Sequence, residues 1–140
     1  ARTRVGRQAQ GRRGPVITAW DAADLRPIGP ATELRVTSRR PDGSLRPAVT
    51  IWHAAVGGAL YIRSAHGPEN GWFRRAVRSG VGRVTAGGVS KDVTFELADA
   101  AVAPEVDAAL HAKYDRYGPG PVGAITGPDA ASTTLLVLPP

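Results

Sequence analysis

Several arginines in this sequence are placed where they could bind an anion. Arg63 and Ser64 end one strand of a predicted hairpin, and Arg74 and Arg75 lie in the first turns of the helix predicted next. A guanidinium group binds phosphate or carboxylate through paired hydrogen bonds, and helix N-terminal amides add donors. Arg46 is a further candidate, either for an anion or for capping a strand. The ordinary alternative is that these arginines are solvated surface residues.

The histidines and serines do not form a recognisable catalytic motif. His53, His66 and His111 lack the close spacing of a helix-borne metal pair, and few carboxylates lie near them in the sequence. The chain has no cysteine, which excludes disulfides, zinc-thiolate sites and a cysteine nucleophile. No GxSxG or Walker pattern occurs. His66 is the histidine that we would test as a proton donor, with an exposed loop position as the alternative.

Length and charge define one domain with a basic arm. The chain has 140 residues, 42% of them hydrophobic and 21% charged, which is typical of a globular protein. Residues 1–15 contain five arginines and no acid, whereas residues 16–140 are nearly neutral. We therefore predict an arm over residues 1–15, either solubilising or in contact with an anionic surface, and a domain over residues 16–140. Nucleic-acid binding is not favoured.

The sequence contains no apolar run that could span a membrane or act as a signal peptide. We therefore expect a cytoplasmic protein.

Hydrophobic periodicity predicts mainly antiparallel β-structure. Two Gly-Gly pairs, at 57–58 and 87–88, separate strand-like runs, and paired glycines supply the positive φ that a tight hairpin turn needs. Alternation of polar and apolar residues places a strand before the first hairpin and another at the C-terminal end. The six predicted strands cover residues 32–38, 47–56, 59–64, 83–86, 89–97 and 132–138.

Three short helices accompany these strands. Thr18 and Asp21 predict the start of a helix that runs through Leu25 and is stopped by Pro27 and Pro30. Helical spacing of apolar residues predicts two more helices, at 70–79 and 104–116. The sequence GPGP at 118–121 is predicted to end the last of them.

Four stretches of the sequence resemble a known superfamily. They are RPAVTIW at 46–52, LYIRS at 60–64, GWFRRAVRSGVGRV at 71–84 and GGVSKDVTFE at 87–96. Together they resemble the flavin-binding split β-barrel superfamily, the pyridoxamine-phosphate-oxidase-like proteins. Within it, the RPAVTIW and LYIRS stretches, Trp72 and the Lys113-Tyr114 pair are most similar to an uncharacterised bacterial family of small proteins. The resemblance covers residues 20–138.

The resemblance implies a fold and a cofactor. The fold would be a six-stranded antiparallel split β-barrel with short flanking helices, forming a homodimer with the cofactor in a groove at the subunit interface. Flavin mononucleotide (FMN) is the implied cofactor, and a deazaflavin is the alternative. Its phosphate would lie against Arg63, Ser64, Arg74 and Arg75, with Arg46 as a weaker candidate. Its ring would lie along the backbone of Val49, Thr50 and Ile51, walled by Trp52 or Trp72. The alternative for each tryptophan is a place in the core, where a tryptophan in a strand is more often found.

Two classes of function follow from this resemblance. The first is a flavin- or deazaflavin-dependent oxidoreductase that acts on a small organic substrate. The second is a ligand-binding barrel that has lost its cofactor. It is suggested by Gly71-Trp72-Phe73-Arg74, because many flavin barrels have a small polar phosphate motif at this helix start. Tyr114 and Tyr117 are predicted to close the pocket or line a dimer contact, with helix packing as the alternative.

Overall fold

The computed structural model describes residues 20–140, so the predicted basic arm and Thr18 lie outside the described residues. The strands are β1 (Leu34–Ser38), β2 (Val49–Ile51), β3 (His53–Val56), β4 (Ala59–Ile62), β5 (Val81–Ala86), β6 (Val89–Leu97) and β7 (Leu135–Leu138). The α-helices are α1 (Ala22–Ile28), α2 (Gly71–Ser79), α3 (Ala103–Tyr114), α4 (Pro119–Thr126) and α5 (Pro128–Ala131). Two 3₁₀ turns, η1 (Ala100–Val102) and η2 (Asp115–Tyr117), flank α3.

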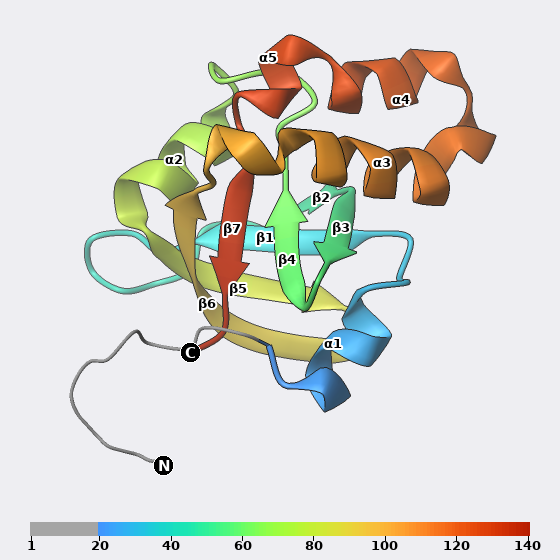
Figure 1. The fold of residues 1–140 in the computed structure, drawn as a ribbon. Coiled ribbons are helices and arrows are strands. Elements are labelled where there is room, and N and C mark those ends of the chain that lie inside the picture. The colour runs from blue at the N-terminus through green and yellow to red at the C-terminus, as the bar shows by residue number, and fades with distance from the viewer. Residues whose placement is uncertain (1–19) are drawn as a thin grey trace.

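All seven strands form one antiparallel sheet that curls into a nearly closed barrel (Figure 1). Their order is β2-β1-β5-β6-β7-β4-β3, so the two edge strands, β2 and β3, are consecutive in the chain. Trp52 alone separates them, and the chain therefore crosses the opening of the barrel covalently rather than through a hydrogen-bonded ladder. The predicted α+β class and split β-barrel architecture are confirmed.

The strand count is seven because the strand predicted at 47–56 is divided at Trp52. Its first part pairs with β1, where Thr50 lies opposite Arg35, and its second part pairs with β4, where Ala54 lies opposite Tyr61. A run rich in β-branched and aromatic residues gives no sign of such a change of partner. Both predicted Gly-Gly hairpins are confirmed, with φ values of 58° and 82° at the first pair and 57° and 81° at the second.

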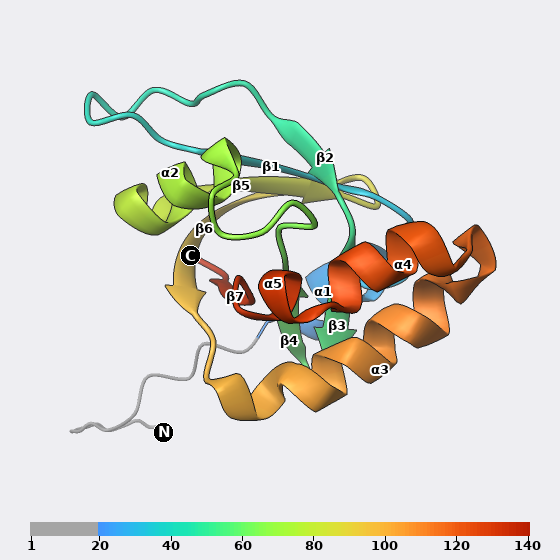
Figure 2. The same cartoon turned by 90° about the horizontal axis from the view of Figure 1, so that it is seen from above.

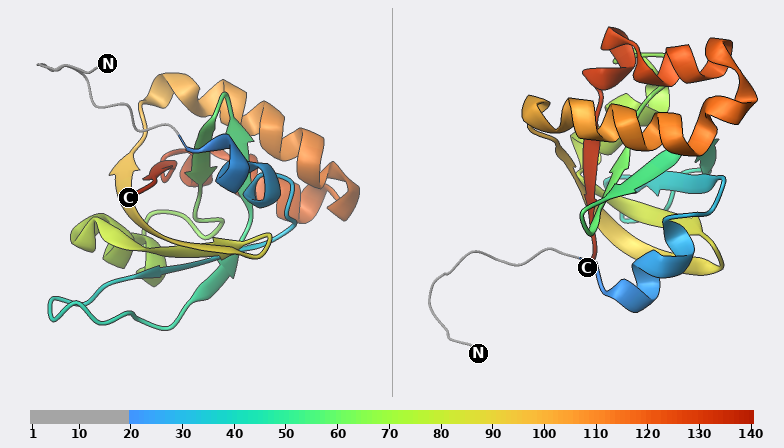
Figure 3. Two further views of the ribbon diagram at one scale, coloured as in Figure 1. Left: turned by 90° about the horizontal axis from the view of Figure 1, so that it is seen from below. Right: turned by 45° about the vertical axis from the view of Figure 1, so that its right-hand side comes forward.

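The helices lie at the ends and flank of the barrel. In Figures 1 and 3, α3, α4 and α5 lie at one end and α1 at the other. Viewed from above, α2 lies beside the loop that joins β1 to β2 (Figure 2). The helices predicted at 70–79 and 104–116 are confirmed as α2 and α3. Within residues 20–140, no helix has the length and apolar character needed to cross a membrane.

The structure differs from the predicted helices at three places, each of them at a proline. The first helix does not stop before Pro27 but includes it and ends at Ile28, with Asp21 as the N-cap. The sequence GPGP was predicted to end a helix, but α4 begins within it. Proline is tolerated at the first position of a helix because the N–H it lacks would have no partner within the helix there. The four-residue helix α5 begins at Pro128 in the same way and was not predicted.

Two apolar clusters hold these elements together. The larger fills the barrel and includes Leu34, Leu60, Val84 and Val137, all fully or almost fully buried. The smaller packs β3 against α3 and α4 and is built around Tyr114. Full burial of one aliphatic side chain of this size contributes roughly 1.5–3 kcal/mol, so the two clusters account for most of the favourable free energy of folding.

Candidate ligand-binding site

A cavity of about 610 Å³ lies at the opening of the barrel. Four segments line it: β2 with Trp52, the turn after β4, the start of α2, and α4. This volume is within the range of sites that hold cofactors and drug-sized ligands. We call it the split cavity. Its lining residues are Val49, Thr50, Ile51, Trp52, Arg63, Ala65, His66, Asn70, Gly71, Trp72, Arg75, Pro121, Ala124 and Ile125.

One strand that lines the split cavity, β2, is an edge strand of the sheet. Among the described strands, β2 pairs with β1 alone, through Val49 to Ile51, so one side of the strand has no strand neighbour. An unpaired strand edge carries N–H and C=O groups that seek partners. Because this edge belongs to a strand that lines the cavity, a planar ligand with polar ring atoms can hydrogen-bond to it.

The start of α2 makes another part of the cavity wall attractive to anions. Asn70 occupies the N-cap position without a side-chain cap hydrogen bond, and the first turn contains no acidic residue. The Arg75 guanidinium folds back over Gly71, where an added Cβ would lie 2.8 Å from Nη1. Within residues 20–140, no carboxylate forms an ion pair with Arg75. Free helix amides and a cation beside them are well suited to a phosphate or a carboxylate.

Arg63 lines the cavity, but its guanidinium is already engaged. The side chain is 1% exposed and forms an ion pair of 2.5 Å with Asp107. It also donates to Thr134 Oγ1 at 2.9 Å, to the Ile125 carbonyl at 3.1 Å and to the Ala103 carbonyl at 3.3 Å. These bonds join the end of β4 to α3, to α4 and to the turn before β7, so the geometry assigns Arg63 a structural role in place of the predicted contact with a phosphate.

The remaining predicted anion ligands are separated in space. Ser64 is fully buried, its amide donates to Thr133 Oγ1 at 2.8 Å, and its hydroxyl has no partner among the described residues. Arg74 is exposed and lies outside the cavity lining. Arg46 lines a small neighbouring hollow together with Arg75. The structure therefore places Arg63 and Arg75 in the lining of one cavity and Arg46 beside Arg75, but it leaves Arg74 outside.

The two predicted ring-walling tryptophans differ in surroundings. Trp52 stacks on Tyr114, with centroids 4.1 Å apart and planes within 7° of each other. Trp72 is 8% exposed and meets Phe73 edge to face in the barrel core. Both also line the split cavity, so each serves the core and the cavity wall together. A cavity of about 610 Å³ is present beside Trp72.

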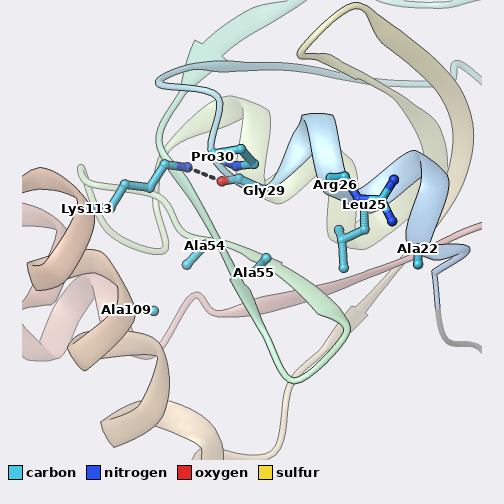
Figure 4. Close-up of a pocket in the computed structure, with 9 residues that line it drawn as sticks. All are labelled: Ala22, Leu25, Arg26, Gly29, Pro30, Ala54, Ala55, Ala109 and Lys113. Carbon is cyan, nitrogen blue, oxygen red and sulfur yellow. Dashed lines mark hydrogen bonds between the residues drawn. The ribbon is translucent and has the colours of Figure 1, made fainter.

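A second cavity, of about 480 Å³, lies between α1, β3 and α3. Figure 4 shows the Lys113 side chain reaching from α3 to the end of α1. Its ammonium donates to the Gly29 carbonyl at 2.8 Å and to the His53 carbonyl at 3.0 Å. Burial lowers the pKa of Lys113 to about 8. This cavity is lined mainly by alanine and aliphatic groups, and its polar bonds are used to join three elements of the fold.

His53 is the buried polar partner of this lysine. Its Nε2 lies 2.7 Å from the Ile28 carbonyl and 3.2 Å from Lys113 Nζ, and a hydrogen on Nε2 satisfies the first of these contacts. The Nδ1 atom is then a buried acceptor without a described partner. Burial lowers the pKa of His53 to about 4, and the nearby Lys113 charge acts in the same direction. A neutral imidazole locked in one tautomer is a structural group rather than a proton shuttle.

The structure also shows the surroundings of His66, His111 and Tyr114. His66 is exposed and lines the split cavity, and His111 contacts Asp115 at 2.7 Å. Tyr114 donates to the Thr32 carbonyl at 2.7 Å and accepts from the His53 amide, and burial raises its pKa to about 12. Over the part of the chain that is described, no group of three potential metal ligands occurs.

Several residues that line the split cavity or contact its lining were not predicted from the sequence. Pro121, Ala124 and Ile125 were missed because α4 was missed. Asp107 was missed because it lies 44 residues from Arg63, and one acid on a helix gives no signal of a buried partner. Asn70 carried a usable signal, since a short polar residue before a helix start predicts an N-cap.

Fold and cavity together define a split-barrel protein with a cavity at the barrel opening. Residues 24–137 match the model of the family described as "Uncharacterized protein conserved in bacteria (DUF2255)". Since the match spans most of the chain, the protein belongs to this family. No curated protein matches the chain.

Two solved structures resemble the fold. One, an "F420 Reductase", has a TM-score of 0.52 at 18% identity, over 85% of this chain and 91% of its own. The other, the "FAD and Heme binding protein from Mycobacterium smegmatis", has a TM-score of 0.44 at 19% identity, over 82% of this chain and 62% of its own. At such identity the first structure supports the barrel fold alone, and the second supports no further argument.

Proposed function

We propose that the protein binds a flavin or deazaflavin in the split cavity and acts as an oxidoreductase on a small organic substrate. One observation carries the proposal. An unpaired strand edge, an aromatic wall and an anion-attracting helix start all line the same cavity of about 610 Å³. The first structural neighbour is an F420 reductase, and its cofactor class agrees with this choice.

The chain's own groups have separate tasks in this proposal. The backbone of β2 binds the polar edge of the ring, and Trp52 and Trp72 exclude water from its faces. The amides at the start of α2 and the Arg75 guanidinium hold a phosphate on the cofactor side chain. When bound, such a cofactor supplies hydride transfer, and the protein contributes position and electrostatics.

His66 lines this cavity and carries an imidazole, a side chain that can donate a proton to a substrate. It is exposed at the cavity rim, on the turn between β4 and α2, so a bound substrate and solvent can both reach it. We assign it the proton that accompanies hydride transfer. A His66→Gln variant is expected to retain cofactor binding and to lose turnover about tenfold to a hundredfold.

Fluorescence titration with riboflavin, FMN and F420 tests the proposal. We expect saturable changes in ring fluorescence with the wild-type protein. Ala124→Trp places a large side chain on an exposed lining position and is expected to abolish binding. Ala22→Trp places the same group at the cavity beside α1 and is expected to leave binding unchanged. Absence of binding by all three compounds would favour the second class of function, a ligand-binding barrel without a cofactor.

A further inference from the structure

Five arginines line one hollow on the flank of the barrel. Arg39, Arg40 and Arg46 come from the loop between β1 and β2, and Arg75 and Arg78 come from α2. The hollow has a volume of about 320 Å³, and Pro41, Ser79 and Val81 complete its lining. No acidic residue is among the lining residues. We call it the arginine hollow.

The composition of the described chain does not account for this concentration of charge. Residues 20–140 contain 13 basic and 12 acidic side chains, so their net charge is close to zero. Five of those basic groups nevertheless surround a single hollow. Like charges held close together repel, and a folded chain retains such an arrangement most readily where an anion relieves it.

Nearby carboxylates neutralise part of the cluster. Arg39 contacts Asp92 at 3.0 Å, but Asp92 is shared with Arg83 at 2.9 Å. Asp42 interacts electrostatically with Arg40, while its carboxylate accepts hydrogen bonds from Ser44. Within residues 20–140, no ion pair involves the other three arginines, Arg46, Arg75 and Arg78. The Nε of Arg46 is buried and has no described partner.

The loop that carries three of these arginines is held in place by its own hydrogen bonds. The Arg39 side chain donates to the Gly43 carbonyl at 2.7 Å, and the Arg40 side chain donates to the Leu45 carbonyl at 3.0 Å. The Arg46 amide donates to the Ser38 carbonyl at 3.0 Å, and the Thr37 hydroxyl donates to the Arg46 carbonyl. The guanidinium groups of Arg39 and Arg40 and the backbone at Arg46 are therefore positioned before any ligand arrives, which lowers the entropic cost of binding.

Arg75 connects the arginine hollow to the split cavity, since it lines both. A small hollow between them is lined by Val49, Arg46, Trp72 and Arg75. From Gly71 to Arg78, α2 extends about 10 Å along its axis. A single phosphate is too small to contact both Gly71 and Arg78. A ligand that binds at the helix start and in the arginine hollow therefore needs at least two anionic groups.

We infer that the arginine hollow binds the acidic end of the ligand whose ring occupies the split cavity. That ligand then carries a second anionic group beyond its first phosphate, as in a deazaflavin with a phosphodiester and carboxylates on its side chain. The inference rests on the proposed function, because it assigns the far end of the same ligand. It also predicts that FMN, which has one terminal phosphate, leaves the hollow partly unused.

A comparison of two double variants tests the inference. Arg40→Ala with Arg78→Ala removes two charges from the hollow without altering a split-cavity residue. Arg35→Ala with Arg116→Ala removes two exposed charges that line neither cavity and is the matched control. Dissociation constants are measured for riboflavin, FMN and F420 at two salt concentrations. We expect F420 to bind at least tenfold more weakly to the first variant than to the control, and riboflavin to differ by less than twofold.

The outcomes separate this inference from the proposed function. If riboflavin, FMN and F420 all fail to bind wild-type protein, the proposed function fails and the inference falls with it. If all three bind but F420 binds equally to both variants, the inference alone is overturned. If the hollow variant loses duplex DNA binding and keeps F420 affinity, a nucleic acid is the occupant and the inference is likewise overturned. Selective loss of F420 affinity with weaker salt dependence supports it.

Discussion

Trp52 and Tyr114 stack face to face with their ring centroids 4.1 Å apart, across the point where the chain passes between the two edge strands of the barrel. The contact joins the opening of the barrel to the last turn of α3. The Tyr114 hydroxyl is fixed in turn by the Thr32 carbonyl and the His53 amide. The shape of the split cavity at this wall therefore depends on one aromatic pair.

Trp52→Leu is expected to lower the free energy of unfolding by about 1–2 kcal/mol, because it removes both aromatic stacking and buried area. Urea denaturation followed by far-UV circular dichroism measures the change. Tyr117→Leu, which removes a tilted and 43% exposed neighbour of the same cluster, is expected to cost less than about 1 kcal/mol. Equal losses in the two variants would contradict the importance assigned to the stacked pair.

Asp107→Asn is expected to destabilise the fold by roughly 3 kcal/mol, because it leaves the Arg63 guanidinium buried without its counter-charge. Asp107 is 35% exposed, so water relieves part of the penalty and a larger effect is not expected. Asp115→Asn removes an exposed acid from the same region of the chain and serves as control. If the two variants have the same unfolding midpoint, the structural role of Arg63 is wrong.

Acid is expected to destabilise the protein between pH 6.5 and about 4 through His53. In this window the unfolded chain protonates His53, while the folded chain keeps it neutral because burial holds its pKa at about 4. Stability is therefore present above pH 6.5 and falls as the pH decreases, by up to roughly 3 kcal/mol. His53→Gln should flatten this dependence, whereas His66→Gln should retain it. A wild-type stability that is equal at pH 7 and pH 4.5 would contradict the assignment.

Lys113 is expected to titrate near pH 8, because burial lowers its pKa to about that value. The sequence has two lysines, Lys91 and Lys113, so reductive ¹³C-methylation gives two lysine resonances to follow by NMR, besides that of the terminal amine. A Lys91→Arg variant assigns them. In the folded protein, loss of the Lys113 charge should begin well below the ordinary range of a lysine. A Lys113 resonance that titrates only above pH 10 would exclude the half-buried position between α1 and β3.

The second Gly-Gly hairpin offers a matched pair of substitutions. Gly88→Ala meets no neighbour and should cost about 1 kcal/mol for the left-handed backbone. Gly87→Ala has the same type of backbone, but its Cβ would lie 2.1 Å from the Pro27 carbonyl oxygen, so α1 must move and the total cost should reach about 3 kcal/mol. Thermal unfolding of the two variants measures the difference. Identical midpoints would show that α1 does not pack on this hairpin.

Local signals predict the hairpins and two of the helices but not the details of the site. Gly57-Gly58 needs its unusual backbone whatever surrounds it, so the sequence alone locates that turn. The change of strand partner at Trp52 depends on barrel closure, which no local pattern records. In the same way, Arg63 is indistinguishable from a phosphate ligand until α3 brings Asp107 against it. Arg75, by contrast, was predicted as an anion ligand, and it lines both the split cavity and the arginine hollow.

A crystal structure of the protein grown with saturating F420 or FMN tests the central claim most directly. The account predicts electron density for the ring in the split cavity, along β2, with the first phosphate at the start of α2 and in contact with Arg75. Density for the ring in the cavity beside Lys113, or well-diffracting crystals without any bound ring, would contradict it.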